Sequence, residues 1–161
     1  MVYAYKYNFI SELSQTLGKI LVSAILKNNL PLPDAIIPVP LHKRRLRWRG
    51  FNQAELLSRF ISQNLAPGFS IPVFSDVLER KKHTSPQMKI KNYQERKKNI
   101  KNMFRFNEKN TEKNILKDKK VLLVDDISTT GATMFECGKV LKFHGASSVL
   151  SVVIARQEMD S

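Results

Sequence analysis

The chain has 161 residues, of which 42% are apolar, a length that suits one domain with a single buried core and is too short for two independent domains. Lys and Arg outnumber Asp and Glu by 27 to 14, and the resulting net charge of +13 favours polyanionic partners such as nucleic acid, anionic lipid or phosphorylated metabolites. No apolar run approaches the roughly 20 residues of a membrane span, and the first residues lack the pattern of a signal peptide, so we expect a cytoplasmic protein without membrane insertion.

The first half of the chain predicts two helices and two strands. Apolar residues at helical spacing indicate an amphipathic helix over about 9–28, in an amino-terminal helical segment that we place at 1–30. The run AIIPVP predicts a buried strand at about 35–39. A second helix follows and ends at Ala-Pro-Gly, and a short strand is expected over about 73–78. The core face of that second helix carries Ala54, Leu57, Ile61 and Leu65.

The second half begins with a basic stretch at 80–100, which is too polar for a core and too long for a tight turn. We expect a flexible loop there, running into a short helix near 92–99, and then a strand at 104–106. The strongest strand signal is at 121–124, followed by a helix at 133–144 and by a strand over SSVLSVVIA. These last three elements form a βαβ unit, which implies parallel strands joined by a right-handed crossover.

Together the elements predict an α/β fold, with a twisted and mainly parallel sheet flanked by helices, in a single domain spanning 1–161. The only cysteine, Cys137, lies within a predicted helix. The chain therefore offers neither a disulfide framework nor a cysteine-rich zinc site, and we expect this residue to be buried.

Two acidic residues, Asp125 and Asp126, follow the strand at 121–124, and a loop at 127–133 comes next. In an open parallel sheet, ligands bind outside the carboxyl ends of the strands. The loop suits a phosphate, because Gly131 lets the backbone approach closely and the next helix directs its free N–H groups toward the anion. Loop hydroxyl groups come from Ser128, Thr129, Thr130 and Thr133. Two carboxylates would repel a phosphate unless they held ribose hydroxyls or a hydrated Mg²⁺.

Other interpretations of this stretch are weaker. A Walker loop has four residues between its glycines, whereas six separate Gly131 from Gly138, and Val140 stands where that motif has Ser or Thr. The Rossmann glycine pattern is absent. An acidic strand end followed by an ordinary helix cap is the remaining alternative, but a cap needs only one of these small polar residues.

The string from Val121 to Thr133 resembles the signature with which type I phosphoribosyltransferases bind phosphoribosyl pyrophosphate (PRPP). That signature has several apolar residues, two acidic residues, two variable positions and then Thr-Thr-Gly-x-Thr. Two further segments are similar to the ComF/GntX-like branch of the family, which is linked to competence and DNA utilisation. They are IPVPLHKRRLRWRGFNQAELL at 37–57 and RKKHTSPQMKIKNYQERKKNI at 80–100.

The resemblance implies a type I phosphoribosyltransferase-like fold and a site for PRPP and Mg²⁺. Asp125 and Asp126 would contact the ribose hydroxyls, directly or through metal-bound water. The residues implied for the 5-phosphate are Ser128, Thr129, Thr130, Gly131, Ala132 and Thr133. Those implied for the pyrophosphate are Leu41, His42, Lys43 and Arg44. The basic stretch 80–100 matches the flexible loop that closes over the reacting centre, and Arg80 and Lys82 join the two aspartates as catalytic candidates.

Electrostatics agrees with these roles. PRPP carries several negative charges and the leaving pyrophosphate gains more, so cations and Mg²⁺ placed there stabilise the transition state. A closing loop would exclude water and limit hydrolysis. His83 either assists these cations or is an exposed loop residue.

Three residues keep two interpretations at this point. Trp48 and Phe51 are interleaved with arginines, and they either stack on nucleobases or belong to the core. Asn52 either lies near the pyrophosphate loop as a site residue or caps the second helix.

Two hypotheses follow from the resemblance. In the first, the chain is a Mg²⁺-dependent PRPP-binding domain that transfers phosphoribose to a nitrogen nucleophile that the motifs do not identify. In the second, it is a non-catalytic cytosolic factor that handles single-stranded DNA for transformation, with PRPP as a regulatory ligand and the DNA-uptake machinery as a partner. Members of that branch usually begin with a four-cysteine zinc module that is not in this sequence, so we expect a truncated or a short natural form.

Overall fold

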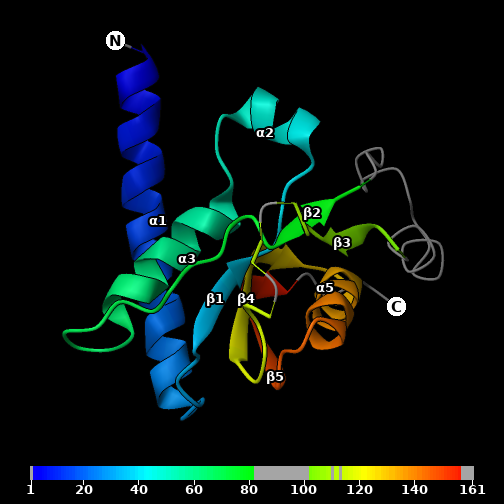
Figure 1. Cartoon of the computed structure of the whole chain (residues 1–161). Coiled ribbons are helices and arrows are strands. Elements are labelled where there is room, and N and C mark those ends of the chain that lie inside the picture. Colours follow the sequence, from blue (N-terminus) through cyan, green and yellow to red (C-terminus); the bar gives the residue numbers. More distant parts are fainter. Residues whose placement is uncertain (1, 82–101, 110, 113, 157–161) are drawn as a thin grey trace, which may run out of the picture.

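The computed structural model describes residues 2–81, 102–109, 111–112 and 114–156 (Figure 1). The helices are α1 (Val2–Lys27), α2 (Lys43–Arg49), α3 (Gln53–Asn64) and α5 (Ala132–Phe143), and the strands are β1 (Ala35–Pro38), β2 (Leu78–Arg80), β3 (Phe104–Phe106), β4 (Lys120–Ser128) and β5 (Ser148–Arg156). Within the described ranges, none of the helices combines the length and the apolar character that crossing a membrane requires.

The main sheet is parallel, and β4 lies at its centre between β1 and β5. In register, Leu122 of β4 lies between Ile36 of β1 and Leu150 of β5. A separate antiparallel ribbon pairs β2 with β3. Helices and this ribbon cover the sheet (Figure 1). The predicted α/β fold with a mainly parallel sheet is therefore confirmed.

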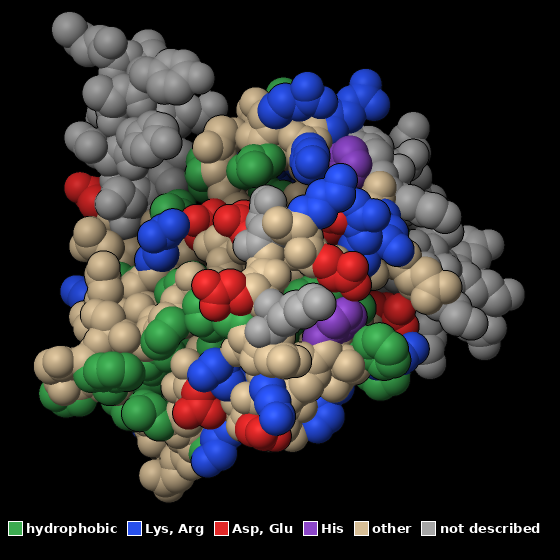
Figure 2. Space-filling view, viewed as in Figure 1, with side chains coloured by type: hydrophobic (Ala, Val, Ile, Leu, Met, Phe, Trp, Pro, Cys, Tyr) green, Lys and Arg blue, Asp and Glu red, His purple; other side chains and the backbone are tan. Residues whose placement is uncertain are grey.

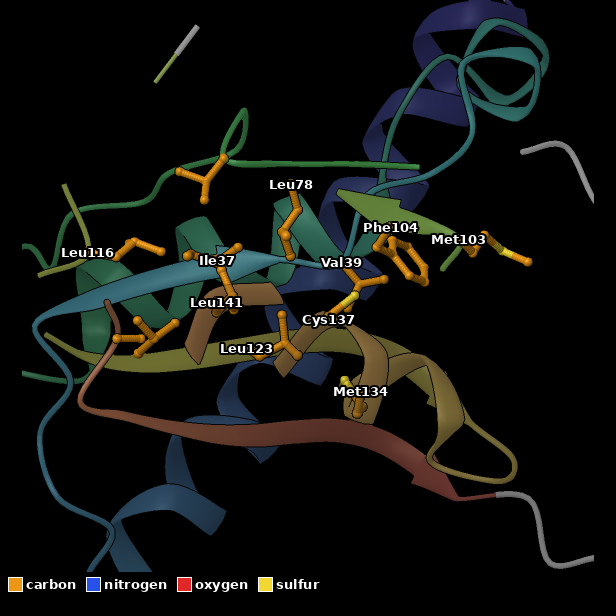
Figure 3. Packing of buried hydrophobic residues seen from close by; sticks show 13 residues of the cluster. Ile37, Val39, Leu78, Met103, Phe104, Leu116, Leu123, Met134, Cys137 and Leu141 are labelled. Atoms are coloured by element: carbon orange, nitrogen blue, oxygen red, sulfur yellow. The ribbon is translucent and has the colours of Figure 1, made fainter. Parts of the chain in front are cut away.

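Successive residues of β4 enter two different cores, because side chains alternate along a strand. Leu122 and Val124 pack on the face covered by α1 and α3. Val121 and Leu123 face the other way, where α5 and the β2–β3 ribbon cover the sheet (Figure 3). Cys137 belongs to this second cluster and is fully buried, as expected. By the same alternation, the next two residues of β4, which are both acidic, belong to opposite faces.

The predicted core face of α3 is also confirmed. All four of its expected residues are buried, namely Ala54, Leu57, Ile61 and Leu65. α1 crosses α3 at Gly18, where an added Cβ atom would lie 2.4 Å from Cδ1 of Phe60. A glycine at this position lets the two helices approach closely, which closes the core on that side of the sheet.

Some element boundaries differ from the sequence expectations. α1 begins at Val2 rather than near residue 9. The strand expected at 73–78 was wrong in extent: Val73 forms only an isolated bridge with Ile36, and β2 begins at Leu78. The chain makes a turn at 75–76 that separates the two, and Pro72 has no N–H to donate. The short helix predicted near 92–99 lies outside the described residues.

Candidate functional site

The carboxyl end of β4 differs from the prediction, in which the strand stops at Val124. The strand instead continues to Ser128, because β5 runs beside it and pairs Ile127 with Ala155 and Ser128 with Arg156. On the other side, β1 ends at Pro38, the register partner of Val124. The two aspartates therefore lie at a step in the sheet, held by β5 and placed past the end of β1.

Asp125 and Asp126 are tied to the backbone at this step. The N–H of Asp126 donates to Oδ1 of Asp125 over 2.9 Å, and the N–H of Ile127 donates to Oδ1 of Asp126 over 2.8 Å. Burial, and after it the negative charge of Asp126, raises the pKa of Asp125 to about 7, although the Asp126 N–H and the charge of Arg80 oppose the shift. A cation bound here would remove part of this electrostatic cost.

The loop predicted to hold a phosphate leads into α5 at Gly131. This glycine has φ of 73° and is the N-cap of α5. Because it has no side chain, the N-cap residue makes no side-chain hydrogen bond to the helix. The N–H of Ala132 donates to Oγ1 of Thr130 over 3.3 Å, so one threonine already supports the turn. An added Cβ at Gly131 would meet no atom within 4 Å. The start of a helix of 12 residues is thus bordered by open space, an arrangement typical of anion sites.

Arg80, at the end of β2, reaches the same region from another part of the chain. Its guanidinium lies over the ring of Phe104 at 5.7 Å from the ring centre. Burial lowers the pKa of Arg80, the charge of Arg45 lowers it as well, and the charge of Asp125 raises it. The fold therefore brings Arg80 within electrostatic reach of both Arg45 and Asp125, and two cations close together favour an anion between them.

The four residues predicted at the pyrophosphate follow β1 and run into α2. Leu41 and His42 precede the helix, and Lys43 and Arg44 are its first two residues. Nδ1 of His42 accepts the N–H of Arg44 over 3.2 Å, so this histidine caps α2. The sequence predicts only a basic loop here, whereas in the structure these residues lead into the helix α2.

Asn52 and Trp48 can now be assigned. Oδ1 of Asn52 accepts the N–H of Ala54 over 3.2 Å, which makes Asn52 the N-cap of α3. Its Nδ2 donates to the carbonyl of Val39 over 3.1 Å and joins the start of α3 to the end of β1. Trp48 is 83% exposed and Phe51 is half-buried, so the core interpretation of Trp48 was wrong.

A groove of about 1290 Å³ runs from α2 past the β2–β3 ribbon to α5. Lys43 and Arg80 line it, together with Phe104 and His144. Neither aspartate of β4 nor any residue of the loop 128–133 belongs to its lining. The groove therefore borders the predicted pyrophosphate side of the site and not the ribose side.

The two aspartates suit Mg²⁺ as a ligand set. Mg²⁺ binds oxygen, uses one or two carboxylates and keeps several waters. No group of three or more His, Cys, Asp or Glu side chains with metal-site geometry occurs among the described residues. Asp125 and Asp126 therefore fit an ion that keeps much of its water better than one enclosed by protein ligands. Lys82 and His83 lie outside the described residues.

Sequence reasoning did not single out Arg45 or Phe104 for this site. Arg45 is one of five cations in LHKRRLRWRG, and periodicity does not reveal which of them lies near Arg80. Phe104 was predicted only as a strand residue. The alternation of aromatic residues with Arg105 is the signal that marks it, because one face of such a strand must be covered.

The chain is similar to several known proteins. The sequence profile of the phosphoribosyl transferase domain matches residues 54–160. Competence protein F of Haemophilus influenzae is 34% identical over 160 residues, which cover 97% of this chain and 66% of that protein. DNA utilization protein YhgH of Salmonella typhi is 33% identical over 153 residues, which cover 92% of this chain and 63% of that protein. The chain spans slightly less than two thirds of the length of these relatives.

Among solved structures, the allosteric regulatory enzyme of purine biosynthesis superposes with a TM-score of 0.51 at 16% identity. The match covers 88% of this chain and 25% of that enzyme. At this level of identity, the likeness concerns the fold alone.

Proposed function

The chain belongs to the phosphoribosyl transferase domain family, and on this premise we propose that it binds PRPP with Mg²⁺ at the carboxyl end of β4, acting as one domain in the cytoplasm. The observation that carries the proposal is the step in the sheet. Asp125 and Asp126 lie past the end of β1, a few residues before the open start of α5 at Gly131. The carboxylates proposed to bind the hydroxyls and the N–H groups proposed to bind the phosphate are therefore close in the chain. Each set binds a different part of PRPP.

In this proposal the two aspartates bind the ribose hydroxyls, directly or through Mg²⁺-bound water. The backbone from Ser128 to Thr133 binds the 5-phosphate at the start of α5. Leu41, His42, Lys43 and Arg44 follow the neighbouring strand and hold the pyrophosphate. The capped start of α2 and the charge of Arg80 support this division, because α2 follows β1 and its Arg45 lies within electrostatic reach of Arg80.

As a transferase, the protein would break the bond between C1 of the ribose and the pyrophosphate oxygen, and form a bond from C1 to a nitrogen of an acceptor. Pyrophosphate would leave with the bonding electron pair, and the acceptor nitrogen would lose its proton. Mg²⁺, when bound, supplies positive charge that neutralises the phosphates. Arg80 and Lys82 stabilise the charge that develops on the leaving group, and no protein nucleophile takes part.

Calorimetric titration of PRPP with Mg²⁺ tests the binding site. We expect micromolar affinity for the wild type and no detectable binding for Asp125→Asn/Asp126→Asn. The matched control is Asp118→Asn, which removes one negative charge just before β4 begins, at the opposite end of the strand. Asp118 has φ of 60°, a conformation that asparagine also adopts readily, so this control should keep both its fold and its affinity. Equal affinity in the double variant and the control would refute the site.

A second candidate function is supported by α2. This helix has the sequence KRRLRWR, contains no acidic residue and buries none of its side chains. Figure 2 shows Lys and Arg side chains gathered over α2 on this face of the molecule. Exposed cations bind the backbone of a nucleic acid, and an exposed indole stacks on unpaired bases. We propose that α2 holds single-stranded DNA, in keeping with the name of one relative, the DNA utilization protein YhgH.

Trp48 is the only tryptophan, so its fluorescence reports directly on α2. We expect single-stranded oligo-thymidylate to quench it, and the affinity to fall steeply as salt rises. Arg47→Ala/Arg49→Ala should reduce the salt slope, whereas Lys19→Ala/Lys27→Ala, which removes two exposed cations from α1, should leave it unchanged. Absence of quenching at low salt would exclude this role. Because PRPP binding is measured in a separate titration, PRPP binding and DNA binding are tested independently.

A further inference from the structure

The two edges of the main sheet are treated differently by the fold. The edge at β1 is short, only four residues, and contains Pro38. It is also covered: the N–H of Ile36 donates to the carbonyl of Pro72, and the N–H of Phe74 donates to the carbonyl of Ile36, both over 2.9 Å. Covering an edge in this way prevents pairing with another chain. This edge is therefore closed.

Among the described residues, the edge at β5 has none of these protections. β5 is nine residues long and pairs with β4 along one side. In the part of the chain that the structure describes, no strand or isolated bridge pairs with its other side. From Ser148 to Ala155 it contains no proline and no charged residue, and Arg156 is its only ion. Lys, Pro and short length are the usual guards of a strand edge, and this one lacks all three.

Side chains of β5 are also incompletely covered on both of its faces. Leu150, Val152 and Ile154 pack at the margin of the core beneath α1 and α3, and they are only half-buried. Val149 and Val153 are half-buried at the margin of the opposite core. By contrast, the four apolar residues at 121–124 of the adjacent strand β4 are at most 2% exposed. Another strand beside β5 would complete both cores.

We propose that a second copy of this chain pairs with β5 through its own β5, in antiparallel orientation about a two-fold axis at Val152. This interface goes beyond the proposed binding functions. Val152 is the middle residue of β5, so pairing over the full length places Ser148 opposite Arg156 and Leu150 opposite Ile154. Two three-stranded sheets then become one sheet of six strands, and each edge is both donor and acceptor for the other.

A second copy is the occupant that the side chains favour. In this register the residues that face each other point to the same side of the joint sheet, and apolar residues meet apolar residues on the face of α1. Each copy contributes one arginine, which faces a serine and not its own counterpart. The remainder of the chain opposes association, because two copies of net charge +13 repel each other. Salt screens that repulsion, so dimerisation should become stronger as salt rises.

Sedimentation of the nuclease-treated chain over a range of concentrations and salt is the test. We expect a monomer–dimer equilibrium that shifts toward dimer with salt. Val152→Lys places two like charges opposite each other at the axis and should weaken the dimer at least about tenfold. The matched control, Gln63→Lys, adds the same charge at an exposed position of α3 and should leave the dimer unchanged apart from the small added repulsion. A monomer under all conditions, or equal behaviour of both variants, would overturn the proposal.

A cross-linking arm keeps the test decisive if Val152→Lys fails to fold. Ser151 is exposed, and the native Cys137 is buried, so Ser151→Cys presents one reactive thiol. In the proposed register the two Ser151 side chains are diagonal neighbours, roughly 7–8 Å apart. A short bis-maleimide should join this variant into a covalent dimer, whereas Gln63→Cys should not be cross-linked into one. Cross-linking no greater than in Gln63→Cys would contradict the interface. Cross-linking that is lost when the protein is first treated with nuclease or placed in high salt would also contradict it.

Discussion

The carboxyl end of β4 and the helix α2 both carry charged residues predicted to contact PRPP, yet their surroundings are opposite. β4 approaches its aspartates through four residues that are at most 2% exposed. α2 has no buried residue, and its indole is 83% exposed. The first region is positioned by packing and the second by its two caps, His42 and Gly50. Substitutions in β4 should therefore affect both stability and function, whereas substitutions on the exposed face of α2 should affect function alone.

The largest expected difference concerns a leucine in each region. Leu123 is fully buried in β4, so Leu123→Ala should lower the free energy of unfolding by about 2–5 kcal/mol. Leu46 of α2 is 40% exposed, and Leu46→Ala should cost less than about 0.5 kcal/mol. Urea unfolding followed by circular dichroism measures both. Similar losses in the two variants would mean that α2 is part of the cooperative core, and the comparison would fail.

The second expected effect is a pH dependence specific to β4. The pKa of Asp125 is raised from 3.8 to about 7 by burial and by Asp126, so the folded state binds a proton that the unfolded state releases. Without metal, this group's contribution to stability is full below pH 3.8 and is lost as the pH rises through about 7, by about 4 kcal/mol in total. Asp125→Asn removes the loss, and should therefore be more stable than the wild type at pH 8 while failing to bind PRPP.

Urea unfolding at pH 5 and pH 8 in the presence of a chelator gives this difference directly. The control is Asp118→Asn, for which no such gain at the higher pH is expected. A wild type and an Asp125→Asn variant that lose stability in parallel would show that the burial of Asp125 carries no electrostatic cost.

The third comparison uses one substitution in both regions. Gly131 and Gly50 have φ of 73° and 83°, and neither has an atom within 4 Å of an added Cβ. Alanine in this left-handed conformation costs about 1 kcal/mol at each place. Gly131→Ala should reduce PRPP affinity, whereas Gly50→Ala, at the C-cap of α2, should reduce the affinity for single-stranded DNA. Titration of both variants with both ligands tests this exchange. Loss of the same ligand in both variants would merge the two regions into one site.

The smallest expected effect on stability belongs to Trp48. Trp48→Ala removes a large side chain that is 83% exposed, so the melting temperature should change by no more than the equivalent of about 0.5 kcal/mol. The loss of oligo-thymidylate binding should be much larger, about 1–3 kcal/mol for one stacked base. A strongly destabilised variant would show that the indole has packing partners in solution and would reverse the contrast with β4.

Local patterns in the chain were enough to predict the parallel sheet and to propose a candidate site at its edge. The apolar run at 121–124, the two aspartates and the small residues of the loop lie within one short segment, and this segment by itself indicates a strand followed by a loop and a helix start. Helix faces were equally readable, because Ala54, Leu57, Ile61 and Leu65 repeat at the helical period and are all buried. Membership of the phosphoribosyl transferase domain family followed from the same motifs.

Features that depend on a distant neighbour were missed or misplaced. β4 continues through its aspartates only because β5, about 30 residues later, provides hydrogen-bond partners as far as Arg156. The strand expected at 73–78 is interrupted by a turn at 75–76, and of its residues only Val73 pairs with β1. The helix α2 has no apolar face, so hydrophobic periodicity does not predict it. Its ends are defined by its two caps.

By itself, then, the sequence determined which chemistry this protein carries: two carboxylates, a glycine with hydroxyl residues before a helix, and separate runs of cations. Only the tertiary structure decided how they meet. It brought Arg80 within electrostatic reach of both Arg45 and Asp125, raised the pKa of that carboxyl by burial, and closed one edge of the sheet, whereas no strand among the described residues pairs with the other edge. The physical reason is that composition and spacing are local, whereas burial, charge proximity and strand pairing depend on residues that are far apart in the chain.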